Sequence, residues 1–93
     1  TPAFFDIKQN YPNPSNPVSK IDFEMPFDGN VSLVVYDISG KEVAVLAEGW
    51  RTADFYSVTF DGSNLASGVY FYRINAENGK ESFAKTLKMI LIK

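Results

Sequence analysis

The chain has 93 residues, a formal net charge of −2 at pH 7, and neither cysteine nor histidine. This length suits one domain, and 45% hydrophobic with 15% aromatic residues is enough for a core, which excludes a disordered chain. The missing residue types exclude disulfides, Cys/His zinc sites and Cys/His nucleophilic pairs. The acidic balance argues against nucleic acid as a partner, because binding it requires a basic face.

Apolar and polar residues alternate along most of the chain, which predicts β-strands. In chain order we expect strands at 3–8, 20–25, 30–38, 42–49, 55–60, 68–76 and 82–93, and no helix. Both faces of 30–38 are apolar, so a central strand covered on both sides is expected there. Turn signals separate the strands at Asp28-Gly29, Ser39-Gly40, Asp61-Gly62, Ser67-Gly68 and Asn78-Gly79. The pattern predicts an all-β, antiparallel Ig-like β-sandwich of about seven strands.

Residues 10–17, "NYPNPSNP", form what we call the proline segment. A residue before proline is pushed out of the helical region, so Tyr11, Asn13 and Asn16 should be extended. We expect a stiff, polyproline-like connector that crosses from one sheet to the other, with asparagine side chains closing local turns. It is a structural crossover, a directly recognised epitope, or both.

The stretch "LASGVYFYR" at 65–73 is typical of the corner of Ig-like sandwiches. In such a corner a tyrosine hydroxyl donates a hydrogen bond to upstream backbone and fixes the crossing between sheets. Tyr70 is the predicted corner tyrosine, with a structural role.

The residues that could perform chemistry do not form a reactive pattern. Asp22 and Glu24 lie on one polar strand face and are interpreted as a solvated surface. The "DGSN" stretch at 61–64 lacks the further acidic ligands that calcium needs, so a plain turn is favoured. The serines have no histidine to activate them. We therefore expect no catalytic residue, no metal site and no cofactor.

Three aromatic residues, Trp50, Phe55 and Tyr72, could form an exposed platform for stacking on sugars. A core or edge role is favoured for them, because a chain of this size needs most of its aromatic residues for its core. A carbohydrate-binding module nevertheless remains an alternative, as does a structural Ig-like accessory module of a surface enzyme.

The last strand carries the apolar run "MILI" at 89–92, with Lys85, Lys88 and Lys93 around it. Lysines beside such a run protect an edge strand from pairing with other chains. The same strand could be gripped by a partner through β-augmentation, and a homodimer through it is a further expectation. The two interpretations are left open. The run is far too short to cross a bilayer, and we expect no signal peptide within these residues.

Four motifs occur in a fixed order: "YPNPSNP", "GNVSLVVYDISGKEVAVL", "LASGVYFYRI" and the closing "KTLKMILIK". Together they closely resemble the C-terminal sorting domain (type A) of the type IX secretion system of Bacteroidetes and related phyla. The resemblance runs from about residue 7 to residue 93. It implies a non-enzymatic secretion signal that directs an upstream cargo protein through the outer-membrane translocon and is then removed by a sortase-like peptidase.

The resemblance also implies partners and a location: the type IX translocon and its shuttle proteins, the peptidase, and passage through the periplasm to the bacterial cell surface or medium. Because the chain opens on Thr1 rather than Met, residues 1–93 are expected to be one C-terminal domain excised from a larger secreted protein. The residues expected to serve recognition are Pro12, Asn13, Pro14, Gly40, Lys41, Gly68, Tyr70, Lys85, Lys88, Met89, Ile90, Leu91, Ile92 and Lys93.

The sequence departs from the family pattern at two positions. Asp54 stands where the family usually has glycine in the turn before the fifth strand, and Phe60 where that strand commonly ends with tryptophan. The first change affects a turn and the second a core volume, so neither alters the motifs that carry the resemblance.

Overall fold

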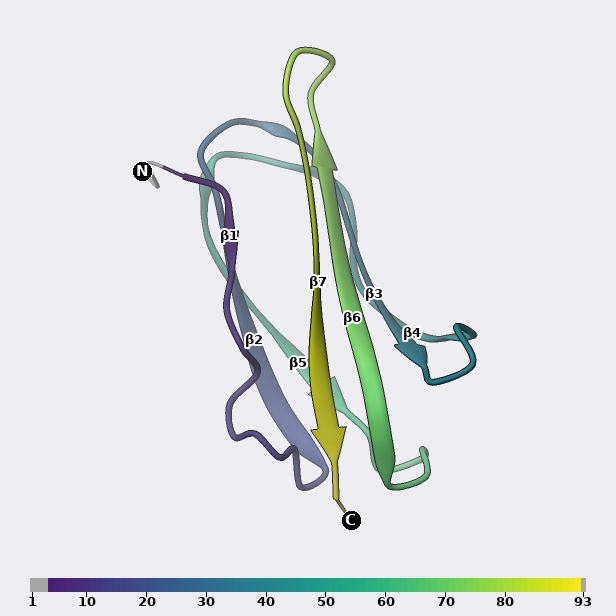
Figure 1. Cartoon of the computed structure of the whole chain (residues 1–93). Coiled ribbons are helices and arrows are strands. Elements are labelled where there is room, and N and C mark those ends of the chain that lie inside the picture. Colours follow the sequence, from purple (N-terminus) through teal and green to yellow (C-terminus); the bar gives the residue numbers. More distant parts are fainter. Residues whose placement is uncertain (1–3, 93) are drawn as a thin grey trace.

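A computed structural model describes residues 4–92 as a two-layer sandwich of antiparallel β-sheets (Figure 1). The strands are β1 (Asp6–Ile7), β2 (Val18–Met25), β3 (Gly29–Asp37), β4 (Glu42–Arg51), β5 (Asp54–Asp61), β6 (Gly68–Glu77) and β7 (Ser82–Leu91). No helix occurs among these described residues. The predicted all-β sandwich of seven strands is confirmed.

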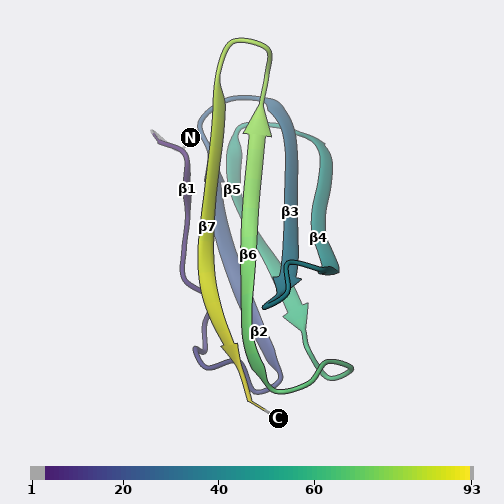
Figure 2. The same ribbon diagram turned by 45° about the vertical axis from the view of Figure 1, so that its right-hand side comes forward.

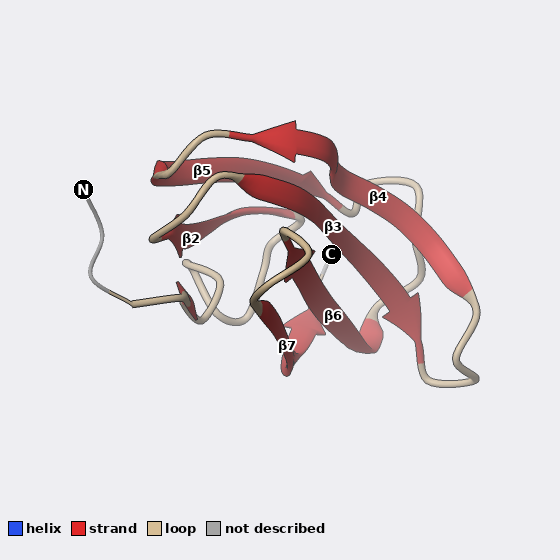
Figure 3. Cartoon of the chain, turned by 90° about the horizontal axis from the view of Figure 1, so that it is seen from above, coloured by secondary structure: helices blue, strands red, loops and turns tan. Residues whose placement is uncertain are grey.

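One layer contains the strands β1-β2-β5 and the other contains β4-β3-β6-β7, in these spatial orders. Figure 3 shows the same strands from above. The predicted last strand is an edge strand, because β7 has only β6 as a strand neighbour in its sheet. The opposite edge of the same sheet is β4.

The core lies between the layers and follows from the alternation in the sequence. The inward side chains of β2, β3 and β6 are almost fully buried; they are Ile21, Phe23, Met25, Val31, Leu33, Val35, Tyr70, Tyr72, Ile74 and Ala76. Five residues of the other strands complete this cluster: Ile7, Ala47, Phe60, Met89 and Leu91. Burying one large apolar side chain contributes about 1.5 to 3 kcal/mol, so this face fixes the register of each strand.

Two hairpin turns confirm the glycine signals in the sequence. In the turn between β3 and β4, Gly40 has a φ of 87°, and its amide donates to the carbonyl of Asp37 at 3.0 Å. Between β6 and β7, Gly79 has a φ of 90°, and the Asn78 amide donates to the Glu81 carbonyl at 3.1 Å. Both glycines adopt left-handed backbone that other residues rarely accept.

The expected path of the proline segment is wrong. It joins β1 and β2, which are neighbours in one sheet, so it does not cross between the sheets. It follows a series of bends rather than a polyproline helix, and the Tyr11-Pro12 and Asn13-Pro14 bonds are cis. Reciprocal backbone hydrogen bonds of 2.9 Å between Tyr11 and Lys20 hold its start against β2. These contacts hold the start of the segment against the three-stranded sheet that contains β1 and β2.

The expectation that β3 is covered on both sides is also wrong. Its inner face packs in the core, but its outer face, with Val34 and Tyr36, belongs to the outside of the four-stranded sheet, which no second layer covers in the part of the chain described. Val34 is nevertheless only 7% exposed, because Val45 of β4 and Arg73 of β6 lie beside it in register. Ile38, in the turn after β3, is 79% exposed.

Candidate recognition surface

The edge of β7 is flanked by residues from the beginning of the chain, which run parallel to it. Phe5 stacks on Phe83 with ring centroids 4.7 Å apart. Further along, Gln9 Nε2 donates to the carbonyl of Lys88 at 2.7 Å. In Figures 1 and 2, β1, an edge strand of one sheet, lies beside β7, an edge strand of the other. Edge strands invite pairing with other chains, and this flanking segment limits access to the edge.

Ser15 of the proline segment closes the end of the same edge. Its amide donates to the Ile90 carbonyl at 2.8 Å, and its carbonyl accepts from the Ile92 amide at 2.8 Å. The contact is a parallel β-bridge between Ser15 and Leu91. Ser15 is fully buried, and its hydroxyl donates to the Pro17 carbonyl at 2.9 Å. The proline segment and the C-terminal strand therefore form one unit, which we call the terminal clasp: residues 8–15 together with 88–92.

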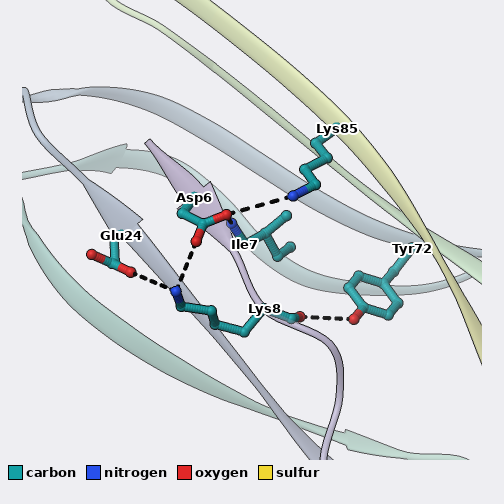
Figure 4. Close-up of polar contacts among 6 residues, drawn as sticks. All are labelled: Asp6, Ile7, Lys8, Glu24, Tyr72 and Lys85. Atoms are coloured by element: carbon teal, nitrogen blue, oxygen red, sulfur yellow. Dashed lines mark hydrogen bonds and ion pairs between the residues drawn. The ribbon is translucent and has the colours of Figure 1, made fainter. Parts of the chain in front are cut away.

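Tyr72 of β6 anchors the clasp from inside the sandwich. Its hydroxyl donates to the Lys8 carbonyl at 2.8 Å and accepts from the Asn10 amide at 2.8 Å. The first of these bonds is drawn in Figure 4. Burial raises the pKa of Tyr72 to about 12, although the hydrogen bond from Asn10 acts in the opposite direction. The tyrosine is neutral at physiological pH and can both donate and accept.

The buried polar residues in the described chain are Asn10, Ser15 and Ser19, and all three lie in or beside the proline segment. Asn10 Nδ2 donates to the Pro12 carbonyl at 3.0 Å and lies 3.4 Å from Ser19 Oγ. This confirms that asparagine closes a local turn here. No buried side-chain nitrogen or oxygen of the described residues lacks a partner, so the clasp is fully satisfied.

A small charged network lies on the outside of β1 (Figure 4). Lys8 Nζ lies 2.7 Å from Asp6 Oδ2 and 3.4 Å from Glu24 Oε2, and Lys85 Nζ lies 3.5 Å from Asp6 Oδ1. The hydrogen bond from Lys8 lowers the pKa of Asp6, and the same contact raises the pKa of Lys8. These side chains are solvated, so the pairs contribute little stability and mainly join β1 to β7.

The predicted tyrosine corner is present. The Tyr70 hydroxyl donates to the carbonyl of Ala66 at 2.6 Å, four residues upstream. Ala66 lies in the connection between β5 and β6, which passes from one sheet to the other. Tyr70 is therefore a structural residue, as expected, and it fixes the path of the chain into β6.

The residues expected to serve recognition fall into three groups. Exposed ones are Pro12, Asn13, Pro14, Gly40, Lys41, Gly68, Lys85, Lys88, Ile90 and Ile92. Buried in the core are Tyr70, Met89 and Leu91, which a partner cannot touch while the sandwich is intact. Lys93 lies outside the described residues. The structure brings the proline segment and the C-terminal strand together, whereas Gly40 and Lys41 lie apart in the turn between β3 and β4.

Sequence reasoning did not single out Gln9 or Ser15, which join the clasp to β7. One signal was available for Ser15: in a segment with three prolines, which have no N–H, it retains a backbone donor. The partner of that donor is 75 residues away in the sequence, so no local pattern could identify it.

The sugar platform that was considered as an alternative is not assembled. Tyr72 was considered as an exposed aromatic residue, but it is fully buried. Trp50 on β4 and Phe55 on β5 are 57% and 61% exposed, and they belong to different sheets. No observation therefore favours a shared aromatic surface.

A hollow of about 650 Å³ lies on the outer face of the four-stranded sheet, and its lining includes both polar residues, such as Asn30 and Glu48, and apolar ones, such as Phe83. Among residues 4–92, no group of three or more acidic side chains is placed to hold a metal ion. No helix that could span a membrane is found there either.

The "DGSN" stretch forms an ordinary turn at Asp61. The Asp61 carboxylate accepts a hydrogen bond from the Ser63 amide at 2.9 Å, and this bond lowers the pKa of Asp61.

The fold and the clasp define a small Ig-like β module that presents surfaces formed by its first and last segments. The family model for the secretion system C-terminal sorting domain matches residues 9–91, so the chain belongs to this family. The predicted family is confirmed, and with it the function of a C-terminal secretion signal. Among curated proteins, no significant sequence match was found.

One solved structure with the same fold is dimeric latent PorU from Porphyromonas gingivalis. It matches 99% of this chain with a TM-score of 0.68 and 19% sequence identity. The match covers 10% of the PorU chain, so the present chain spans about a tenth of that protein. At this identity the likeness shows the fold alone.

Proposed function

We propose that residues 1–93 are a single C-terminal domain of a larger secreted protein and that the folded domain is recognised by the type IX outer-membrane translocon and its shuttle proteins. A sortase-like peptidase then removes the domain, and the cargo passes through the periplasm to the cell surface or the medium. Membership of the sorting-domain family carries this proposal. The domain itself has no enzymatic role in this scheme.

The geometry of the terminal clasp supports recognition of side chains rather than addition of a strand. At Lys88, Ile90 and Ile92 the outward backbone groups of the chain already bond to Gln9 and Ser15. A partner strand, or β7 of a second copy, would have to displace these bonds first. The exposed side chains at the same end, Ile90 at 38% and Ile92 at 47%, are reachable without any rearrangement.

The test is an export assay in a bacterium that has the type IX system. Residues 1–93 are fused behind a periplasmic reporter, and the reporter is measured in periplasm, on the surface and in the medium. We expect export of the unaltered fusion, and its retention in the periplasm when residues from Met89 onward are deleted. Failure of the unaltered fusion to leave the periplasm would contradict the proposal.

Because the deletion removes Met89 and Leu91 from the core, a substitution that spares the fold is also needed. Ile92→Asp changes an exposed side chain and should reduce export while leaving the melting temperature close to that of the parent. Val45→Asp is the matched control, since Val45 is 48% exposed but lies on β4, away from the clasp. Equal export of both variants would exclude the C-terminal side chains as the recognised feature.

A further inference from the structure

The outer face of the four-stranded sheet carries an apolar and basic surface that the core does not explain. We call it the arginine–aromatic patch and define it as Tyr36, Ile38, Phe71, Arg73, Lys88 and Ile90. The register places Tyr36 beside Phe71, and Phe71 beside Lys88, in one row across β3, β6 and β7. Outer faces of sandwiches are normally polar, so apolar residues at these positions call for an explanation.

The patch is hollowed. A depression of about 440 Å³ is lined by Tyr36, Ile38, Phe71 and Arg73, together with Asp37, Gly40 and Thr86. The turn between β3 and β4, which carries Ile38 and Gly40, projects from the outer side of the sheet and forms one wall (Figures 2 and 3). A hollow with an aromatic floor and a projecting wall suits an inserted side chain better than a flat sheet does.

The two cations of the patch have no acidic partner. Within residues 4–92, the ion pairs involve Lys8 and Lys85, and neither Arg73 nor Lys88 forms one. Asp37 also lines the depression, but its carboxylate is used by its own turn, where it accepts from the Ser39 amide, the Ser39 hydroxyl and the Lys41 amide. The positive charge of the patch is therefore available to an external group.

The spacing of the cations indicates the form of that group. Arg73 pairs with Thr86, and Lys88 lies two residues further along β7 on the same face. Such diagonal neighbours lie about 7 to 8 Å apart, with their Cβ atoms somewhat closer. In an extended chain, side chains two residues apart on one face are separated by about 6.8 Å. Two carboxylates at alternate positions of an extended segment match this spacing.

We propose that the arginine–aromatic patch binds an extended acidic segment of a partner protein, with carboxylates at alternate positions facing Arg73 and Lys88 and an apolar side chain in the hollow beside Phe71. A second copy of this domain would place the same cations against each other, and like charges oppose such a pairing. The proposal rests on the proposed function, and it specifies the chemistry by which a secretion partner contacts the domain.

The patch also accounts for predicted recognition residues that the terminal clasp does not include. Gly40 lines the hollow, and Lys41 follows it in the same turn. Lys88 and Ile90 belong to both surfaces, since their side chains point outward from β7 while their carbonyls bond to the clasp. The patch and the clasp thus meet along β7.

The proposal is tested by NMR titration of the isotope-labelled 93-residue chain with a capped heptapeptide that has glutamate at its third and fifth positions and leucine elsewhere. We expect amide shifts concentrated at residues 36–40, 71–73 and 86–90. Replacing both glutamates with glutamine, or changing the protein to Arg73→Gln/Lys88→Gln, should weaken binding at least tenfold. Lys80→Gln, which removes an exposed lysine outside the patch, should leave binding unchanged.

Several results would overturn the proposal. The glutamine peptide binding as tightly as the glutamate peptide would remove the role of charge, and shifts confined to β5 or β4 would place binding elsewhere. If the amide shifts of the patch residues change with protein concentration in the absence of peptide, a second copy of the chain is the occupant. Binding to phosphatidylglycerol vesicles with no response to the peptide would assign the patch to a membrane instead.

The export assay separates this proposal from the proposed function. If the unaltered fusion is exported and Arg73→Gln/Lys88→Gln is retained in the periplasm with an unchanged melting temperature, both stand. If both fusions are exported equally, the patch has no role in export and this inference fails, while the sorting function stands. If the unaltered fusion is not exported, the sorting function itself fails.

Discussion

The contribution of Tyr72 to stability can be tested by removing its hydroxyl. Tyr72→Phe keeps the ring and creates no large cavity, but it deletes two hydrogen bonds of 2.8 Å and leaves the Asn10 amide and the Lys8 carbonyl without this partner. An intramolecular hydrogen bond contributes about 0.5 to 1.5 kcal/mol net, and an orphaned buried group costs about 1 to 3 kcal/mol. Because the bond from Asn10 is buried and the bond to Lys8 is only partly buried, we expect a total loss of about 2 to 3 kcal/mol.

The same substitution at two other tyrosines gives a graded control. Tyr70→Phe deletes one hydrogen bond, to Ala66, and should cost about 1 kcal/mol. Tyr36→Phe deletes none in the described residues and should cost about 0.5 kcal/mol or less. Urea unfolding followed by tryptophan fluorescence measures the three values. If Tyr72→Phe is no more destabilised than Tyr36→Phe, the prediction that the Tyr72 hydroxyl stabilises the terminal clasp is wrong.

The pKa of Tyr72 gives a second, independent signature. Its folded pKa of about 12 lies above the ordinary tyrosine value of 10.0. Because the folded pKa is raised, the contribution of the neutral Tyr72 hydroxyl to the free energy of unfolding is fully present below pH 10. It is lost as pH rises from 10 to 12. The difference in unfolding free energy between the parent and Tyr72→Phe should therefore shrink over this pH range, and a constant difference would refute the assignment.

Two further predictions concern the strand ends. Gly29→Ala should destabilise the domain by about 1 to 3 kcal/mol in a urea titration, because the added Cβ would lie 2.6 Å from the backbone oxygen of Glu77; a neutral effect would show that β3 and β6 can separate there. Hydrogen bonds from Ser39 and Lys41 lower the pKa of Asp37, so Asp37→Asn should lose stability relative to the parent at neutral pH, and the difference should diminish as pH falls below about 3.8. Thermal unfolding at pH 7 and pH 3 measures this, and an equal difference at both values would contradict it.

The strands could be predicted from the sequence because the core uses one face of each. Ile21, Phe23 and Met25 alternate strictly, and all three are buried. The corner tyrosine was predictable for the same kind of reason, since its partner lies only four residues upstream. Local periodicity and local hydrogen bonds are both visible in a single sequence.

Contacts between distant segments were not predictable in this way. The proline rules correctly exclude helix from the proline segment, but they do not say that Ser15 bonds to Ile90 and Ile92. Apolar residues on both faces of β3 were interpreted as burial on both sides, whereas Tyr36 belongs to an uncovered outer face. The periodicity of a sequence indicates which strand faces are apolar. It does not show whether such a face is covered by another layer of the same chain or is a surface that binds a partner.

The clasp also has a consequence for biosynthesis. Gln9 and Lys88 are 79 positions apart, and both ends of that contact are needed before the edge of β7 is closed. Gln9 leaves the ribosome long before Lys88 is synthesised. A truncated or stalled chain can therefore form much of the sandwich and still lack the terminal clasp. A receptor that reads this end would therefore admit only chains whose synthesis had passed the last strand.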